Sequence, residues 1–136
     1  AYTANTKRRR MRNRHLLIDS FIWLEIVQGS EKGKQALEIM DGAEAIHTSV
    51  VNLYEVSYRL RTLRDEATAH DLITTISSHA IIHPVDREIA LAAAPLRLLH
   101  GYGAVDALYH ATAEVHNLEM LTGDQHFRDI ERAILI

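Results

Sequence analysis

The chain has 136 residues, with 15 lysines and arginines against 18 aspartates and glutamates, nine histidines and no cysteine. This length favours one domain with a core that needs no disulfide or structural metal, and the lack of cysteine excludes a disulfide framework and a cysteine nucleophile. Residues 1–14 hold six of the basic residues and no acid, so residues 15–136 carry a net charge of −9, which excludes a uniformly basic nucleic-acid binder.

The N-terminal region does not have the pattern of an export signal or a membrane anchor. No apolar run approaches the roughly 20 residues that span a bilayer, and acidic residues interrupt the stretch 15–26 that follows the basic start. We therefore expect a cytoplasmic protein. Residues 1–14 are predicted to form a basic arm, either a disordered tail or partly foreign sequence ahead of Met11, which could also attract RNA phosphates without sequence preference. Residues 15–136 are predicted to form a single domain.

In chain order, short apolar runs alternate with segments of helical periodicity. We predict strands at about 15–18, 45–48, 79–83, 118–121 and 133–136, helices at about 20–27, 31–41, 50–63, 65–77, 86–100 and 105–116, and a helical turn at 125–129. Short apolar strands that alternate with helices indicate an α/β fold with a central, mostly parallel sheet covered on both faces. Ligands of such sheets bind beyond the carboxyl ends of the strands.

Four acidic residues are expected at that carboxyl edge. Asp19 directly follows the first strand, Asp124 lies three residues after Leu121, and Asp106 begins a helix, where the dipole favours a carboxylate. Glu55 lies in the second turn of the helix that Ser49 would cap. Carboxylates held together repel one another or recruit a cation, and oxygen ligands suit Mg²⁺ or Mn²⁺ rather than zinc. Such a site can bind a phosphodiester and activate water, although each acid alone would more often be a helix cap or a surface charge.

Three segments resemble the signature blocks of the PIN domain family, in the order that the family shows. They are LLIDSFIWLEI, SVVNLYEVSYRL and GAVDALYHATAEVHNLEMLTGDQHF. The resemblance covers nearly all of 15–130, its third block is the most specific, and the size is that of VapC-type toxins. It implies a three-layer α/β/α PIN-like fold. It also implies a metal site for one or two Mg²⁺ or Mn²⁺ ions, with supporting hydroxyl groups: Asp19, Glu55, Asp106 and Asp124 as ligands, Ser20 and Thr122 as supports.

The reaction that this resemblance implies is metal-dependent hydrolysis of RNA by a water nucleophile, carried out by the toxin of a toxin–antitoxin pair. The implied partners are an RNA substrate, a protein antitoxin that inserts an arginine into the acidic pocket, and a second copy in a homodimer. Two features depart from the family pattern. The segment 101–103 (Gly-Tyr-Gly) replaces a lead-in rich in serine and threonine before Asp106, and the basic arm is not a family feature.

Several alternatives stay open at this point. Arg59 lies one turn after Glu55 and would either contact a substrate phosphate or pair with this acid. His126, beside Asp124, is a candidate substrate contact, whereas the other histidines lack a zinc-binding spacing and are expected to be structural or solvent-exposed. A non-catalytic module could use the acidic pocket to bind a basic partner segment. A phosphate-handling enzyme of another family is disfavoured, since no GxxxxGK[ST] occurs and the first strand is followed by DSFIW.

Overall fold

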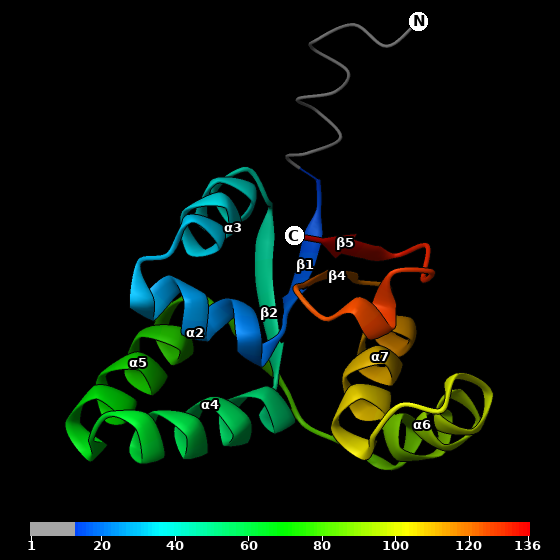
Figure 1. Cartoon of the computed structure of the whole chain (residues 1–136). Coiled ribbons are helices and arrows are strands. Elements are labelled where there is room, and N and C mark those ends of the chain that lie inside the picture. Colours follow the sequence, from blue (N-terminus) through cyan, green and yellow to red (C-terminus); the bar gives the residue numbers. More distant parts are fainter. Residues whose placement is uncertain (1–12) are drawn as a thin grey trace, which may run out of the picture.

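The computed structural model describes residues 13–136, so most of the expected basic arm lies outside the described residues. In chain order the elements are β1 (His15–Ile18), α2 (Ser20–Gln28), α3 (Glu31–Asp41), β2 (Ala45–Ser49), α4 (Val50–Leu63), α5 (Glu66–His79), β3 (Ile81–His83), α6 (Arg87–His100), α7 (Ala104–His116), β4 (Glu119–Thr122), η1 (Gln125–Phe127) and β5 (Ala133–Leu135). Five strands form one sheet of order β3-β2-β1-β4-β5, and every neighbouring pair is parallel (Figure 1).

Helices cover both faces of this sheet, which confirms the predicted three-layer α/β/α architecture. Helices α2 to α5 lie on one face, and α6 and α7 lie on the other (Figure 1). Successive residues of a strand point to opposite faces, and β1 shows this directly. Leu16 and Ile18 pack with α2 to α5, while Leu17 packs with α6 and α7. The continuous apolar run of β1 is therefore explained by burial on both sides.

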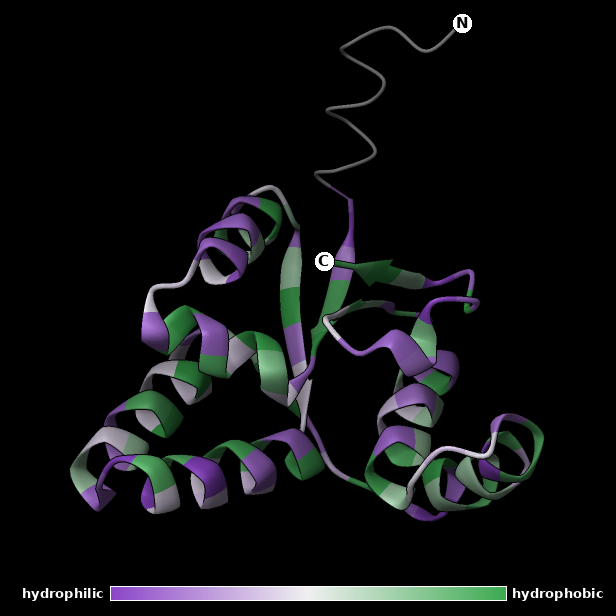
Figure 2. Cartoon of the chain, in the orientation of Figure 1, coloured by the Kyte–Doolittle hydropathy of each residue, from purple (hydrophilic) through white to green (hydrophobic). Residues whose placement is uncertain are grey.

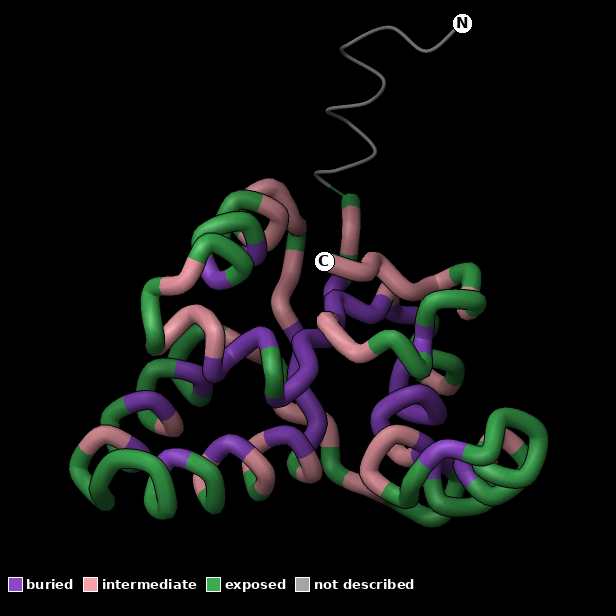
Figure 3. Tube along the Cα trace, in the orientation of Figure 1, coloured by how far each residue is buried: buried purple, intermediate pink, exposed green. Residues whose placement is uncertain are grey.

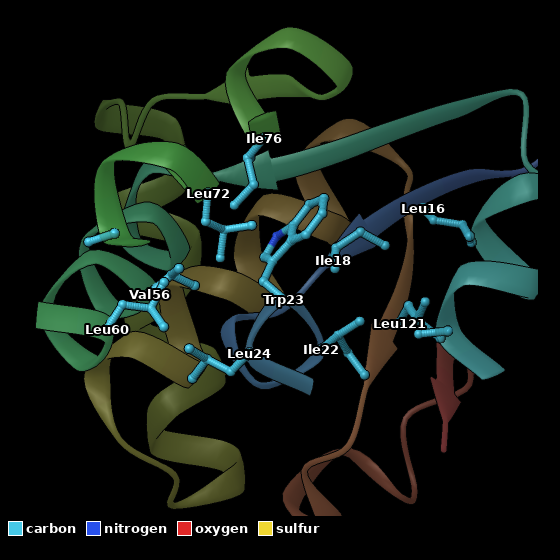
Figure 4. Close-up of a cluster of buried hydrophobic side chains, with 12 residues drawn as sticks. Leu16, Ile18, Ile22, Trp23, Leu24, Val56, Leu60, Leu72, Ile76 and Leu121 are labelled. Atoms are coloured by element: carbon cyan, nitrogen blue, oxygen red, sulfur yellow. The ribbon is translucent and has the colours of Figure 1, made fainter. Parts of the chain in front are cut away.

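The first core cluster is built around Trp23 on α2, whose ring lies among aliphatic side chains from β1, α4 and α5 (Figure 4). Its indole N–H donates to the hydroxyl of Thr48 on β2 at 3.3 Å, so the polar atom of this buried ring is satisfied. Apolar residues recur along the strands and within the helices (Figure 2), and many of these regions are buried (Figure 3), whereas α6 stays mostly exposed despite its apolar residues. Amphipathic helices on a central sheet thus account for the fold.

One predicted strand was assigned too early in the chain. The sequence indicated a strand over 79–83, whereas β3 comprises Ile81–His83, because α5 continues through His79. The N–H of Ala80 donates to the carbonyl oxygen of Ile76 at 2.8 Å, which ends the helix. The strand itself was recognised, but the helix before it is longer than its apolar periodicity indicated.

The other predicted elements are found within one or two residues of the expected positions, and the last strand, β5, lies at an edge of the sheet. Ser49 caps α4 as expected, since its hydroxyl accepts from the N–H of Val51 at 3.2 Å. The side chain of Asn52 completes the cap by accepting from the N–H of Ser49 at 3.2 Å. Over residues 13–136, no helix is both long and apolar enough to cross a membrane.

Candidate metal centre

A pocket of about 260 Å³ opens at the carboxyl edge of the sheet, between α2, α4, α7 and the loop after β4. The parallel topology explains its place, because β1 and β4 both end there and each is followed by an acidic residue. All four acids predicted from the sequence line this pocket, together with Ser20 and Arg59. The structure therefore brings together residues that lie up to about a hundred positions apart in the chain, and their role as metal ligands stays a prediction.

Asp19 is the most buried of the four acids, with 7% of its surface exposed. Its Oδ1 caps α2 by accepting from the N–H of Ile22 at 3.1 Å, and its Oδ2 accepts from the hydroxyl of Thr122. The pKa of Asp19 is raised to about 6, mainly by burial and in small part by the charge of Asp124, while these hydrogen bonds and one from the N–H of Phe21 oppose the rise. A cation beside this carboxylate would offset the cost of ionising it in the interior.

Thr122 and Ser20, the two predicted supporting hydroxyl groups, have different contacts. The Thr122 oxygen, besides donating to Asp19, accepts from the N–H of Asp124 at 3.0 Å, so it links two of the acids directly. The Ser20 oxygen accepts from the side-chain amide of Asn52 at 3.2 Å, a contact that ties α2 to α4. Thr122 therefore contacts two of the acids, whereas Ser20 is itself positioned by Asn52, a residue that the sequence did not single out.

Asp106, Asp124 and His126 form a compact group, in which the two acids line the pocket. Nδ1 of His126 lies 3.3 Å from Oδ2 of Asp106 and 3.2 Å from Oδ1 of Asp124. One ligand atom from each residue lies within 4.8 Å of the others. Burial raises the pKa of Asp106 above its usual range, and the charges of Asp124 and Glu55 add to this, while the hydrogen bond with His126 opposes it. His126, predicted as a substrate contact, thus lies against two of the acids.

Glu55 and Arg59 are contributed by α4, one helical turn apart. Glu55 is half-buried and Arg59 is exposed, and both line the pocket. In the described part of the chain, no ion pair joins Arg59 to Glu55. The guanidinium therefore lies at the rim of an acidic pocket without being engaged by the neighbouring acid, which suits it to an anionic group entering from solvent.

Two further residues position the pocket and were missed in the sequence. Tyr109, one turn after Asp106 on α7, is fully buried, and its hydroxyl lies 2.7 Å from the carbonyl oxygen of Leu17 and 3.2 Å from that of Leu121, where it can donate to either. It thereby anchors α7 to β1 and β4. Gly123 lies so close to the ring of Phe21 that a Cβ there would approach it to 2.3 Å. The spacing of Tyr109 from Asp106 was a visible signal, whereas nothing local to Gly123 indicated this contact.

The donor set of the pocket fits a hard divalent cation. Its four carboxylates supply oxygen ligands, and the pKa values of two of them are raised by burial, as expected where negative charge is held out of water. Carboxylate oxygen is the ligand that Mg²⁺ and Mn²⁺ prefer. A cation at such a site can bind a phosphate group and activate a water molecule.

The parallel sheet between two layers of helices, with four acidic side chains in a pocket at its carboxyl edge, defines an α/β domain with a candidate site for a divalent cation. A model of the PIN domain family matches residues 16–133. The chain belongs to the PIN domain family. A search among curated proteins finds no sequence match.

Solved structures share the fold over most of the chain. A toxin–antitoxin complex from Klebsiella pneumoniae contains a chain that is 25% identical, with a TM-score of 0.74 over 88% of this chain and 95% of that one. VapBC2 from Rickettsia felis, bound to a promoter DNA fragment, is 17% identical, with a TM-score of 0.72 over 90% and 97%. VapC20 from Mycobacterium tuberculosis, described as a sarcin–ricin loop cleaving toxin, is 16% identical, with a TM-score of 0.67 over 76% and 85%.

Proposed function

We propose that this protein is a Mg²⁺- or Mn²⁺-dependent endoribonuclease that acts as the toxin of a toxin–antitoxin pair. The observation that carries the proposal is the convergence of four carboxylates in one pocket of a PIN domain: Asp19, Glu55, Asp106 and Asp124. The likeness to toxin–antitoxin structures, one of them a toxin that cleaves the sarcin–ricin loop, supports the toxin role and the choice of RNA.

In this proposal the four acids hold the metal and the exposed residues beside them hold the substrate. A bound divalent ion would activate a water molecule and offset the charge that develops on the phosphate. Thr122 keeps Asp19 oriented toward the pocket by donating to it, and Arg59 at the rim would bind a phosphate oxygen and so position the RNA backbone. Residues that fix the reacting groups in place lower the entropic part of the barrier.

The proposed protein partners are an antitoxin and a second copy of the chain. An acidic pocket open to solvent can receive an arginine side chain, which would block the metal site by direct competition. The homodimer is supported by apolar side chains that face solvent on α6. Leu91, Leu98 and Leu99 are 62%, 89% and 76% exposed, and packing of α6 against a second copy would remove this apolar surface from water.

Cleavage of a labelled RNA in the presence of Mg²⁺, Mn²⁺ or a chelator tests the proposed activity. We expect cleavage with either metal, none with chelator, and loss of at least about a hundredfold in Asp106→Asn, because carboxylates that hold a catalytic metal cannot be replaced by amides. Asp71→Asn is the matched control, since Asp71 is exposed on α5, away from the pocket. RNA that is retained but not cleaved would favour a non-catalytic binding module instead, and full activity of Asp106→Asn would contradict the mechanism.

A further inference from the structure

His126 is held in a defined place by the short helix η1 that contains it. The next residue, Phe127, is 1% exposed and packs against the rings of Tyr102 and Tyr109, which anchors the turn in the core. At the other end of the turn, Oδ1 of Asp124 accepts from the N–H of His126 at 2.9 Å. The imidazole is 65% exposed, but these two contacts fix the backbone that carries it. Its position beside the acids is therefore built into the fold.

The nitrogen that faces the acids is Nδ1, and its spacing from them is that of neighbouring ligands on one ion. It lies 3.3 Å from Oδ2 of Asp106 and 3.2 Å from Oδ1 of Asp124. Adjacent ligands of an octahedral ion with bonds of about 2.1 Å lie about 3 Å apart. An ion could therefore bind between these three atoms with only small side-chain movements.

We propose that Nδ1 of His126 is a direct ligand of the divalent ion, beside Asp106 and Asp124, and that this nitrogen makes the site prefer Mn²⁺ to Mg²⁺. The inference rests on the metal site of the proposed function and adds a ligand and a selectivity to it. Mg²⁺ and Mn²⁺ both bind carboxylate oxygen, but Mn²⁺, as a transition ion, gains more affinity than Mg²⁺ from an added imidazole nitrogen. Carboxylates joined by one imidazole form a mixed set that Mn²⁺ accommodates.

Two other roles for His126 lead to different measurable behaviour. If His126 contacts the substrate instead, its ring would move away from both acids. It would then not affect metal binding in the absence of RNA. As a cation that merely pairs with Asp106 and Asp124, it would compete with the metal, so its removal would strengthen metal binding. As a ligand, its removal weakens the binding of Mn²⁺ more than that of Mg²⁺, because only the transition ion gains substantially from nitrogen.

Metal titration without RNA separates these roles. Mn²⁺ and Mg²⁺ are titrated calorimetrically into the wild type, His126→Asn and His126→Asp, with His70→Asn as the matched control, since His70 is exposed on α5. We expect the wild type to bind Mn²⁺ more tightly than Mg²⁺. His126→Asn should lose about tenfold or more in Mn²⁺ affinity and less than about threefold in Mg²⁺ affinity, and His126→Asp should retain Mg²⁺ binding but lose the Mn²⁺ preference.

A spectroscopic measurement reports the bond itself. In pulsed electron paramagnetic resonance of the Mn²⁺-bound protein, ¹⁵N-labelled histidine should give a coupling from one directly bound nitrogen in the wild type and in His70→Asn, and none in His126→Asn. If the wild type binds both ions but shows no such coupling, or if His126→Asn binds Mn²⁺ as tightly as the wild type or more tightly, the inference is wrong while the metal site stands. If the wild type binds neither ion, the proposed function fails with it.

Discussion

Thr122, the last residue of β4, donates its hydroxyl hydrogen to the carboxylate of Asp19, which lies 103 positions earlier in the chain, directly after β1. The same hydroxyl oxygen accepts from the N–H of Asp124 at 3.0 Å. Both Thr122 and Asp19 are buried, so this contact is shielded from water and relatively strong. One small side chain thus sets the relative position of an acid from the first strand and an acid from the fourth.

Replacing Thr122 by valine should disturb both acids without changing the shape of the core. Valine cannot donate to Asp19, so the pKa of Asp19 should rise above its value of about 6. The variant should lose about 1–3 kcal/mol of stability, because a buried carboxylate and a backbone N–H lose their partner. Urea denaturation and a nuclear magnetic resonance titration of Asp19 measure these effects. Thr122→Ser, which keeps the hydroxyl, is the control, and equal behaviour of the two variants would exclude the role of this hydrogen bond.

Asp19→Asn should remove the effect of metal without weakening the metal-free fold. The pKa of Asp19 is raised from 3.8 to about 6, so the protonated acid contributes stability that is fully present below pH 3.8 and is lost as the pH rises through about 6. The metal-free variant should therefore be more stable than the wild type above about pH 7. Asparagine still caps α2.

The two proteins should respond differently to metal. Mg²⁺ or Mn²⁺ should raise the melting temperature of the wild type, because the ion binds only the folded state, and it should leave that of Asp19→Asn nearly unchanged. RNA cleavage should be lost in the variant as well. The comparison is made by thermal denaturation with and without each ion, and a variant that metal still stabilises would show that Asp19 is not a ligand.

The positions of the acids could be predicted because a parallel sheet places the ends of its strands at one edge. Asp19 and Asp124 follow β1 and β4, so their convergence required only the recognition of two apolar strands and the parallel topology. The placement of Asp106 at the start of α7 followed in the same way from the glycine-containing break before it. The convergence of the acids could be predicted from the sequence because it depends on the backbone topology.

Contacts that depend on side-chain packing across elements were not predictable. The burial of Tyr109 against the carbonyl oxygens of β1 and β4 depends on the distance between α7 and the sheet, which periodicity does not report. The row formed by His15, His47 and His83 depends on strand order, because each lies on a different strand of the sheet. These histidines were expected to be structural or exposed, and their mutual contacts appear only once β1, β2 and β3 are placed side by side.

Gly123→Ala should disturb the loop that carries Asp124. A Cβ at this position would lie 2.3 Å from the ring of Phe21, so either the ring or the loop must move. We expect a loss of about 1–3 kcal/mol in stability and weaker metal binding. Adding Phe21→Ala should restore part of both, since it removes the atom that clashes. Unfolding and metal titration of the two single variants and the double variant measure the coupling, and strictly additive effects would show that this contact is not the cause.

The histidine row should make the fold sensitive to acid. Nε2 of His47 lies 3.0 Å from Nδ1 of His15, and its Nδ1 lies 2.8 Å from Nε2 of His83. The pKa of His47 is lowered from 6.5 to about 4, mainly by burial and in part by the charges of His83, His15 and His116. A base with a lowered pKa contributes stability that is fully present above pH 6.5 and is lost as the pH falls through that value toward about 4.

His47→Gln should flatten this dependence, since glutamine cannot take up a proton in this range. The free energy of unfolding is measured by urea denaturation at several pH values between about 4 and 8. The wild type should lose more stability than His47→Gln on acidification, whereas His70→Asn, a change at an exposed position on α5, should follow the wild type. Parallel curves for the wild type and His47→Gln would show that another group controls the acid response.

The exposed leucines of α6 lead to a last prediction, on the oligomeric state. Leu98 is 89% exposed, so a change there should alter the stability of a monomer by no more than about 0.5 kcal/mol. If α6 forms a homodimer interface, Leu98→Glu places a charge on each side of it and should yield monomers. Leu37→Glu, at a position 48% exposed on α3, is the matched control and should stay dimeric. Sedimentation over a range of concentrations measures this, and a wild type that is monomeric throughout would rule out the α6 dimer, leaving these leucines as a surface for a different protein partner.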